Sequence, residues 1–256
     1  MRLKQLIFSV FIFIYFLPVK AQEINLPQYL NYIGENQFMI TPAYVGIGTK
    51  FRVRMNGLTQ WLGVKNAPNT QLLSLESRLT DKLGGGLVVF KDSNGNTSQQ
   101  GFKGTIANHL ILSEVNESFL SFGLSYSLIV FDINTLDFQD LDAGLGNERN
   151  FTSSNFDVSM LYRFNGYSVS FFISNILNKE ERFFSNGEPL ILRRYSLYNS
   201  FILLKSSGDV EIEPSILVEY FESDSRSRTD LNLKVRKRTK NGYLWAGFTY
   251  NFLNDQ

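Results

Sequence analysis

Hydrophobic and polar residues alternate with a two-residue period in about eleven segments of this chain. In the clearest segment, residues 119–131, Leu120, Phe122 and Leu124 alternate with serine and glycine. Further segments of this kind lie near residues 51–60, 70–79, 84–91, 156–163, 230–236 and 243–252. The alternation predicts β-strands with one apolar face and one small or polar face. A soluble β-sandwich has the same period, so the alternation by itself leaves both classes open.

Two further patterns favour a membrane β-barrel. Connections alternate in length along the chain: those near residues 92–99, 132–153 and 178–188 are long, and those near 114–117 and 165–166 are short. Outer-membrane barrels have short periplasmic turns and longer external loops. Aromatic residues also gather at segment ends, as the girdles at the two membrane interfaces require: Tyr162, Phe164, Tyr167, Tyr195, Tyr198, Tyr243 and Tyr250.

We therefore predict an all-β fold, a transmembrane antiparallel up-and-down β-barrel with about 11–12 strands present. Single-chain bacterial barrels have an even number of strands, whereas a count near eleven leaves the last strand, residues 243–252, ending outside. The chain is accordingly expected to lack one or more closing C-terminal strands of a barrel of about 12–14 strands. Either closure is imperfect or the chain is part of a longer protein.

The N-terminus predicts export. Arg2 and Lys4 precede an apolar run at residues 6–17, and Ala21 ends the segment, which is the pattern of a cleaved signal peptide at residues 1–21. An uncleaved anchor is the alternative, but a spanning helix needs about 20 apolar residues. The mature chain then begins near Gln22, with a periplasmic or lumen segment at residues 22–50 and the outer-membrane barrel at 51–256.

Composition excludes several classes of function. Without the signal peptide the 25 basic residues fall to 22 against 24 acidic ones, a net charge of −2, and nothing indicates nucleic acid as a partner. Cysteine is absent and His109 is the single histidine, so we expect no metal site, no cofactor and no enzyme activity. A lipid hydrolase would have to use His109 as its base. Its surroundings, residues 106–111, instead indicate a strand residue on a barrel wall.

Charged residues recur on the polar faces of the predicted strands. We expect the following to face the lumen: Arg52, Arg54, Asp157, Arg163, Glu211, Glu213, Glu219, Lys234 and Arg236. An antiparallel hairpin through residues 222–228 would place the glutamates of this set opposite the basic residues of the next strand. These charges then form either a conduit or docking surface, or a cross-strand ion ladder that fills the lumen.

Two motifs near the N-terminus stand in a particular order. The first comprises Tyr29 and residues 41–46, and the second residues 60–71. Their marker residues are Tyr29, Pro42, Ala43, Tyr44, Gly46, Gln60, Trp61, Gly63, Ala67, Pro68, Thr70 and Gln71. Taken one by one they suit turns and a membrane rim, since proline fixes φ, glycine permits tight backbone, and Trp and Tyr favour interfaces.

Taken together and in this order, the motifs resemble those of the PorP/SprF family of outer-membrane proteins associated with type IX secretion in Bacteroidota. The similarity spans essentially the mature chain, with mild departures at Thr41 and Val45. The resemblance implies a non-enzymatic barrel that works with type IX secretion components. Its implied partner is a secreted protein with a type B C-terminal sorting domain, such as an adhesin involved in gliding motility. The alternative is a FadL-like or porin-like channel for small or hydrophobic solutes.

Overall fold

The structure is a computed structural model that describes residues 37–48, 51–133, 150–177, 193–204, 209–222, 226–240 and 242–254. The predicted signal peptide, residues 1–21, lies outside these ranges, as does the motif residue Tyr29. Among the described residues, no helix is long and apolar enough to cross a membrane.

Within the described residues, two short helices precede a run of twelve strands. The elements are α2 (Gln37–Ile40), η2 (Pro42–Tyr44), β1 (Arg52–Thr59), β2 (Asn69–Arg78), β3 (Leu83–Asn94), β4 (Thr97–Ser113), β5 (Ser118–Ile133), β6 (Asn150–Phe164), β7 (Tyr167–Ser174), β8 (Arg194–Phe201), β9 (Leu203–Leu204), β10 (Val210–Phe221), β11 (Ser227–Thr239) and β12 (Gly242–Asn254). The predicted all-β class and the predicted number of about 11–12 strands are confirmed.

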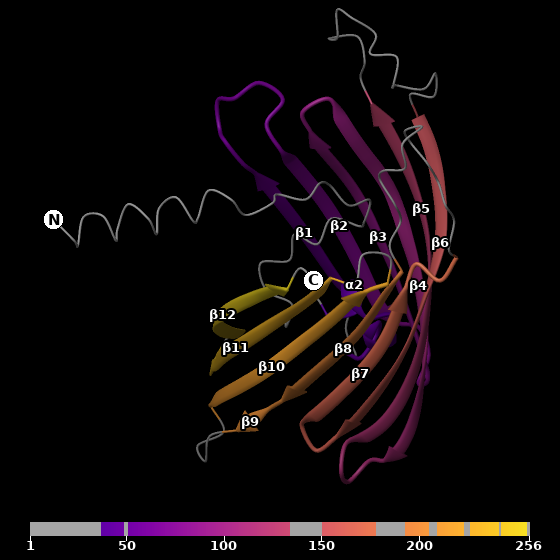
Figure 1. Cartoon of the computed structure of the whole chain (residues 1–256). Helices are drawn as coiled ribbons and strands as arrows, with labels where there is room; N and C mark the ends of the chain where they lie inside the picture. Colours follow the sequence, from indigo (N-terminus) through magenta and orange to yellow (C-terminus); the bar gives the residue numbers. More distant parts are fainter. Residues whose placement is uncertain are drawn as a thin grey trace, which may run out of the picture.

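The strands form one antiparallel meander in which, apart from the short β9, each strand pairs with the next one along the chain (Figure 1). The hydrogen-bonded order runs from β1 to β8 and then through β10, β11 and β12. The two-residue β9 follows β8 after a break at Ile202 and pairs with β10. Neighbouring pairs need only short connections, because antiparallel strands can be joined by tight turns.

The turn between β6 and β7 follows directly from its sequence. Asn165 and Gly166 both have positive φ, 44° and 81°. This is the requirement of the tight two-residue hairpin, and Asn-Gly meets it best. The predicted polar loop at residues 92–99 is wrong, however, because β3 continues to Asn94 and β4 begins at Thr97. Serine, threonine and glutamine there complete the backbone ladder, and Gly95, with φ of 62°, makes the turn.

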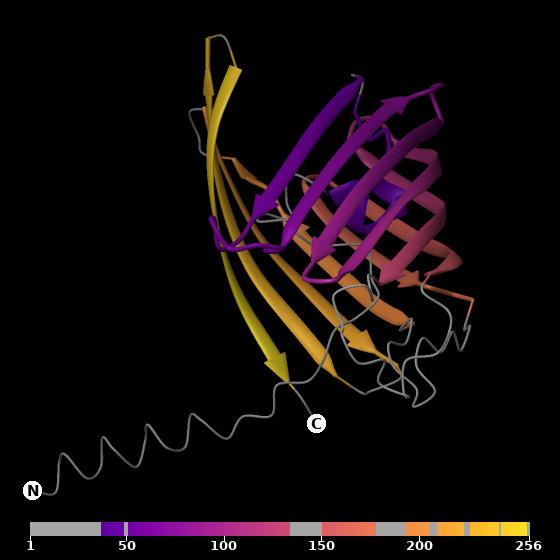
Figure 2. The ribbon, with the colours of Figure 1, turned by 90° about the horizontal axis from the view of Figure 1, so that it is seen from above.

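The sheet curves around α2 and η2, so that it has a concave and a convex face (Figure 2). On β5 the concave residues Ser121 and Ser125 are 0% and 1% exposed, whereas the convex residues Phe122 and Leu124 are 47% and 42% exposed. The same division holds on β10, where buried glutamates alternate with exposed aliphatic residues. Polar side chains are thus buried and apolar ones exposed, the reverse of a soluble domain.

The described sheet is not closed into a barrel, whereas the sequence predicts an up-and-down barrel that lacks one or more closing strands. Its two edge strands, β1 and β12, do not pair with each other. Eleven strands that alternate in direction leave β1 and β12 running the same way, so a direct pairing of the two would be parallel. The observed fold is an open, curved, antiparallel sheet.

Candidate functional site: a plug on the concave face

Residues 37–48 lie inside the curve of the sheet and contact β4, β5 and β6 through η2 (Figures 1 and 2). We call this segment the plug. Its sequence suits a tight, buried path: Pro42 starts the 3-10 turn, and the Val45 amide donates to the Pro42 carbonyl at 3.1 Å. Thr41, Ala43 and Val45 are at most 1% exposed. Residues 41–46 of the first family motif are therefore part of the buried core of the concave side.

Three polar contacts fasten the plug backbone to the sheet. The Ala43 amide donates to Ser159 Oγ at 2.7 Å, and the Gly46 amide contacts Glu76 Oε2 at 3.3 Å. The third joins His109 Nε2 to the Val45 carbonyl at 3.0 Å. Because buried backbone groups need partners, these contacts fix where the plug sits.

His109 lies on β4, which confirms its prediction as a strand residue. A carbonyl oxygen only accepts, so His109 Nε2–H donates to Val45, and Nδ1 accepts from the Ser121 hydroxyl at 2.7 Å. The ring is 2% exposed and both nitrogens are engaged. This arrangement positions the plug and leaves neither nitrogen free to take a proton from a substrate.

Glycines on the sheet make room for the plug. A Cβ on Gly84 or Gly86 would lie within 3.0 Å of Val45 atoms, and a Cβ on Gly123 would lie equally close to Pro42 and Ala43 backbone. Gly46 itself has φ of 73°, a conformation that favours glycine. The absence of side chains at these glycines of β3 and β5 thus allows the motif to pack closely against the two strands.

The plug also reaches the far wall of the sheet. Tyr44 packs edge-on against Tyr198 of β8, with ring centroids 6.1 Å apart. Gln37 Nε2 donates to the Tyr198 hydroxyl at 3.3 Å and approaches Glu213 Oε1 at 3.4 Å. Burial, and then the neighbouring Tyr198, raise the pKa of the Tyr44 hydroxyl. The plug therefore contacts strand residues that lie more than 100 positions away from it in the sequence.

The second family motif lies elsewhere, in the connection between β1 and β2 and at the start of β2. Trp61 and Leu62 are 68% and 88% exposed, and Gly63 has φ of 91°. The Gln60 amide donates to the Pro68 carbonyl at 3.0 Å and closes the loop. Ala67 lies in this loop as well. Among the β2 markers, Thr70 donates to Asp92 Oδ1, while Gln71 is exposed. Residues 41–46 of the first motif and residues 60–71 of the second therefore lie in different parts of the described structure.

The predicted glutamates of β10 lie opposite the predicted basic residues of β11 in the pairing of these two strands. Glu211 pairs with Arg236 and also contacts Arg238, and Glu213 lies 3.6 Å from Lys234. Glu219 is 3.4 Å from Arg194 of β8 and 4.0 Å from Arg228. These contacts form an ion ladder along the concave face.

The remaining predicted charges also find partners. Arg52 and Arg54 approach Glu76 Oε1 at 3.2 and 2.8 Å, and Arg163 lies 5.9 Å from the centre of the Phe119 ring. Asp157 lies 2.5 Å from Lys103, both side chains being at most 6% exposed. Four of the partners were not predicted from the sequence: Glu76, Lys103, Arg194 and Arg228. The two-residue alternation could have placed Lys103 and Glu76 on the concave face, since both share that face with buried serines.

No cluster of three His, Asp or Glu side chains suited to a metal ion occurs within the described ranges. A sheet with an exposed apolar face and a buried, charged, plugged face defines a membrane-type β-sheet protein. The family model for the type IX secretion system membrane protein PorP/SprF matches residues 21–256, so the chain belongs to this family. The resemblance seen in the motifs is confirmed. Neither the curated proteins nor the solved structures contain a match.

Proposed function

We propose that this chain is an outer-membrane component of type IX secretion that assists the secretion or surface anchoring of a partner protein. The partner would be an adhesin-like protein with a type B C-terminal sorting domain. In this proposal a signal peptide at residues 1–21 directs export and is removed near Gln22. The observation that carries it is the inverted sheet: an apolar convex face around a concave face that holds the buried plug.

The height of the apolar face supports insertion in a membrane. On β5 every outward residue from Leu120 to Val130 is apolar or aromatic. This stretch is about 33 Å along the strand at about 3.3 Å per residue. A tilt of about 40° reduces it to a height of about 25 Å, which is the apolar band of outer-membrane barrels.

Closure into a barrel belongs to the same proposal. The edges of β1 and β12 carry backbone groups that hydrocarbon cannot satisfy. Because β1 and β12 run in the same direction, an antiparallel barrel needs an odd number of further strands between them, at least one.

A gene-deletion strain tests the secretion role. We expect that removing the gene abolishes surface display of one large secreted protein, measured by protease accessibility on whole cells, and that the wild-type gene restores it. Uptake of small solutes should stay unchanged, since the plug packs against the concave side. Normal display of every surface protein in the deletion strain would contradict the proposal.

The competing channel hypothesis rests on the polar concave wall. Single-channel conductance of the purified protein in planar bilayers separates the two. We expect little conductance from the full chain and a large increase when residues 37–48 are deleted. High conductance from the intact chain would favour the channel.

A further inference from the structure

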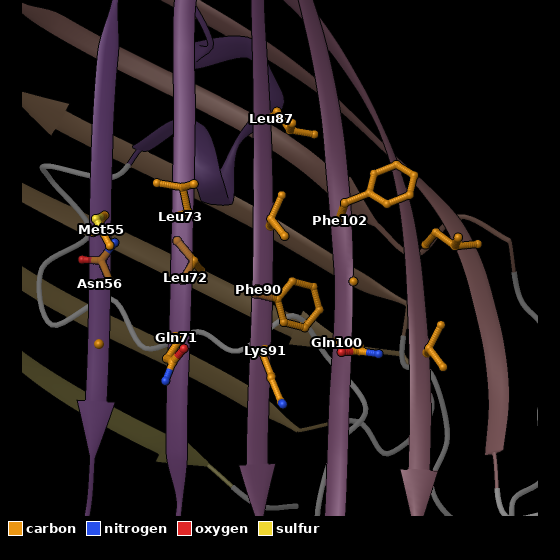
Figure 3. A pocket seen from close by; sticks show the side chains of 15 residues that line it. Met55, Asn56, Gln71, Leu72, Leu73, Leu87, Phe90, Lys91, Gln100 and Phe102 are labelled. Atoms are coloured by element: carbon orange, nitrogen blue, oxygen red, sulfur yellow. The ribbon is translucent and has the colours of Figure 1, made fainter.

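An apolar groove crosses the convex face over β1 to β5, with a volume of about 960 Å³ (Figure 3). Volumes of about 300–1,000 Å³ are typical of ligand sites. The groove lies on the side away from the plug, because its walls are outward residues such as Met55, Leu73 and Phe102. Gly57 of β1 also lines it, and a Cβ there would meet nothing within 4 Å.

Cross-strand register shows where the groove sits in the apolar band. One row of outward partners, entirely apolar, forms its floor: Met55, Leu73, Val89, Phe102 and Leu128. Four residues further along the strands, and one outward row beyond the groove's lining, the outward row is entirely polar: Thr59, Asn69, Ser93, Ser98 and Asp132. The groove therefore ends at the border between the apolar band and the rim that carries the long connections.

The row between these two holds the polar end of the groove. Lys91 stands there between its register partners Gln71 and Gln100, and all three side chains are exposed (Figure 3). No ion pair joins Lys91 to any residue that the structure describes. An unneutralised ammonium at the border of an apolar band attracts anionic headgroups. Two amides beside it supply further hydrogen-bond donors.

We propose that this groove binds an anionic phospholipid of the surrounding membrane, with its acyl chain along Leu73 and Val89 and its phosphate at Lys91. The lipid is favoured over a protein partner because the groove continues the lipid-facing band and carries its one charge where headgroups lie. This inference rests on the membrane insertion proposed above.

Native mass spectrometry of the full chain in detergent tests the site, with phosphatidylglycerol and phosphatidylcholine of the same acyl chains as probes. We expect a preference for phosphatidylglycerol, which Lys91→Gln lowers about fivefold, the contribution of one lysine near an anionic lipid. Val89→Trp, which fills the groove, should reduce the retention of both lipids. The matched control is Lys237→Gln, an exposed outward lysine of β11 at the opposite rim, which should change nothing.

If the preference for phosphatidylglycerol falls equally in the Lys91 and Lys237 variants, or falls in neither, the proposed lipid site is refuted. Flotation of the protein with liposomes, measured in parallel, keeps the two proposals apart. Flotation without a lipid preference refutes the lipid site in the groove and leaves the proposed membrane insertion intact. A folded chain that does not float refutes both proposals. Each variant is first compared with the wild type by circular dichroism, so that misfolding is recognised.

Discussion

Replacing Gly123 with alanine should undock the plug while the sheet stays folded. A Cβ at Gly123 would lie within 3.0 Å of three backbone atoms of Pro42 and Ala43. Backbone cannot rotate out of the way as a flexible side chain can, so the plug has to shift as a unit. The same movement stretches the bond from the Ala43 amide to Ser159 Oγ.

The size of the effect follows from the cost of overpacking. One extra methyl group in a close-packed site costs about 1–3 kcal/mol. If that cost falls on the docked plug alone, the undocked population rises about 5- to 150-fold. The sheet loses nothing comparable, because alanine suits a strand at least as well as glycine.

Thiol labelling measures the undocked population. The chain contains no cysteine, so Val45→Cys introduces a single thiol at a side chain that is 0% exposed. Its reaction with a water-soluble maleimide should accelerate about 5- to 150-fold when Gly123→Ala is added. The matched control is Gly104→Ala on the neighbouring β4, where a Cβ meets nothing within 4 Å, and the rate should not change. An unchanged rate in the Gly123 variant, or an equal increase in the control, would refute the reasoning.

Three further predictions concern stability, each measured as urea unfolding in detergent. Glu76→Gln, which weakens the contacts to the plug and to β1, should cost about 1.5–3 kcal/mol, whereas the exposed ion-paired Glu222→Gln should cost at most about 1 kcal/mol; equal costs would contradict the role of burial. Lys103→Met should cost about 3–5 kcal/mol by leaving Asp157 buried without its cation, and adding Asp157→Asn should recover part of that loss; additive losses would show that the pair does not interact. Gly166→Ala should cost about 1–2 kcal/mol because of its positive φ, and a neutral result would mean that the turn rearranges.

Local patterns were enough to predict most strands. The two-residue alternation located β1 and β2 within one residue of their observed ends, and Asn165-Gly166 identified the hairpin between β6 and β7. Composition misled at residues 92–99, where polar side chains were read as a loop although backbone pairing continues through them. Side-chain polarity reports which environment a residue faces, and hydrogen bonding of the strand backbone does not depend on it.

The burial and the partners of residues 41–46 could not be predicted from the sequence. Its proline, glycine and tyrosine were explained as turn and interface residues, one at a time. In the structure they are buried together against Gly84, Gly86 and Gly123, with Ser159 and Glu76 as partners. None of these partners is adjacent in the sequence, and no periodicity links them. The ion ladder of β10 and β11, by contrast, could be predicted from the sequence, because a single hairpin sets the register of the two strands.

The sequence by itself determined the class of strand, the alternation of its faces and the family, because each of these is written in neighbouring residues or in short ordered motifs. Only the tertiary structure decided that residues 41–46 plug the concave face and that Lys103 neutralises Asp157. The physical reason is the same in each case. Plug docking and buried ion pairing depend on how distant strands curve and meet, and that geometry is a property of the whole sheet.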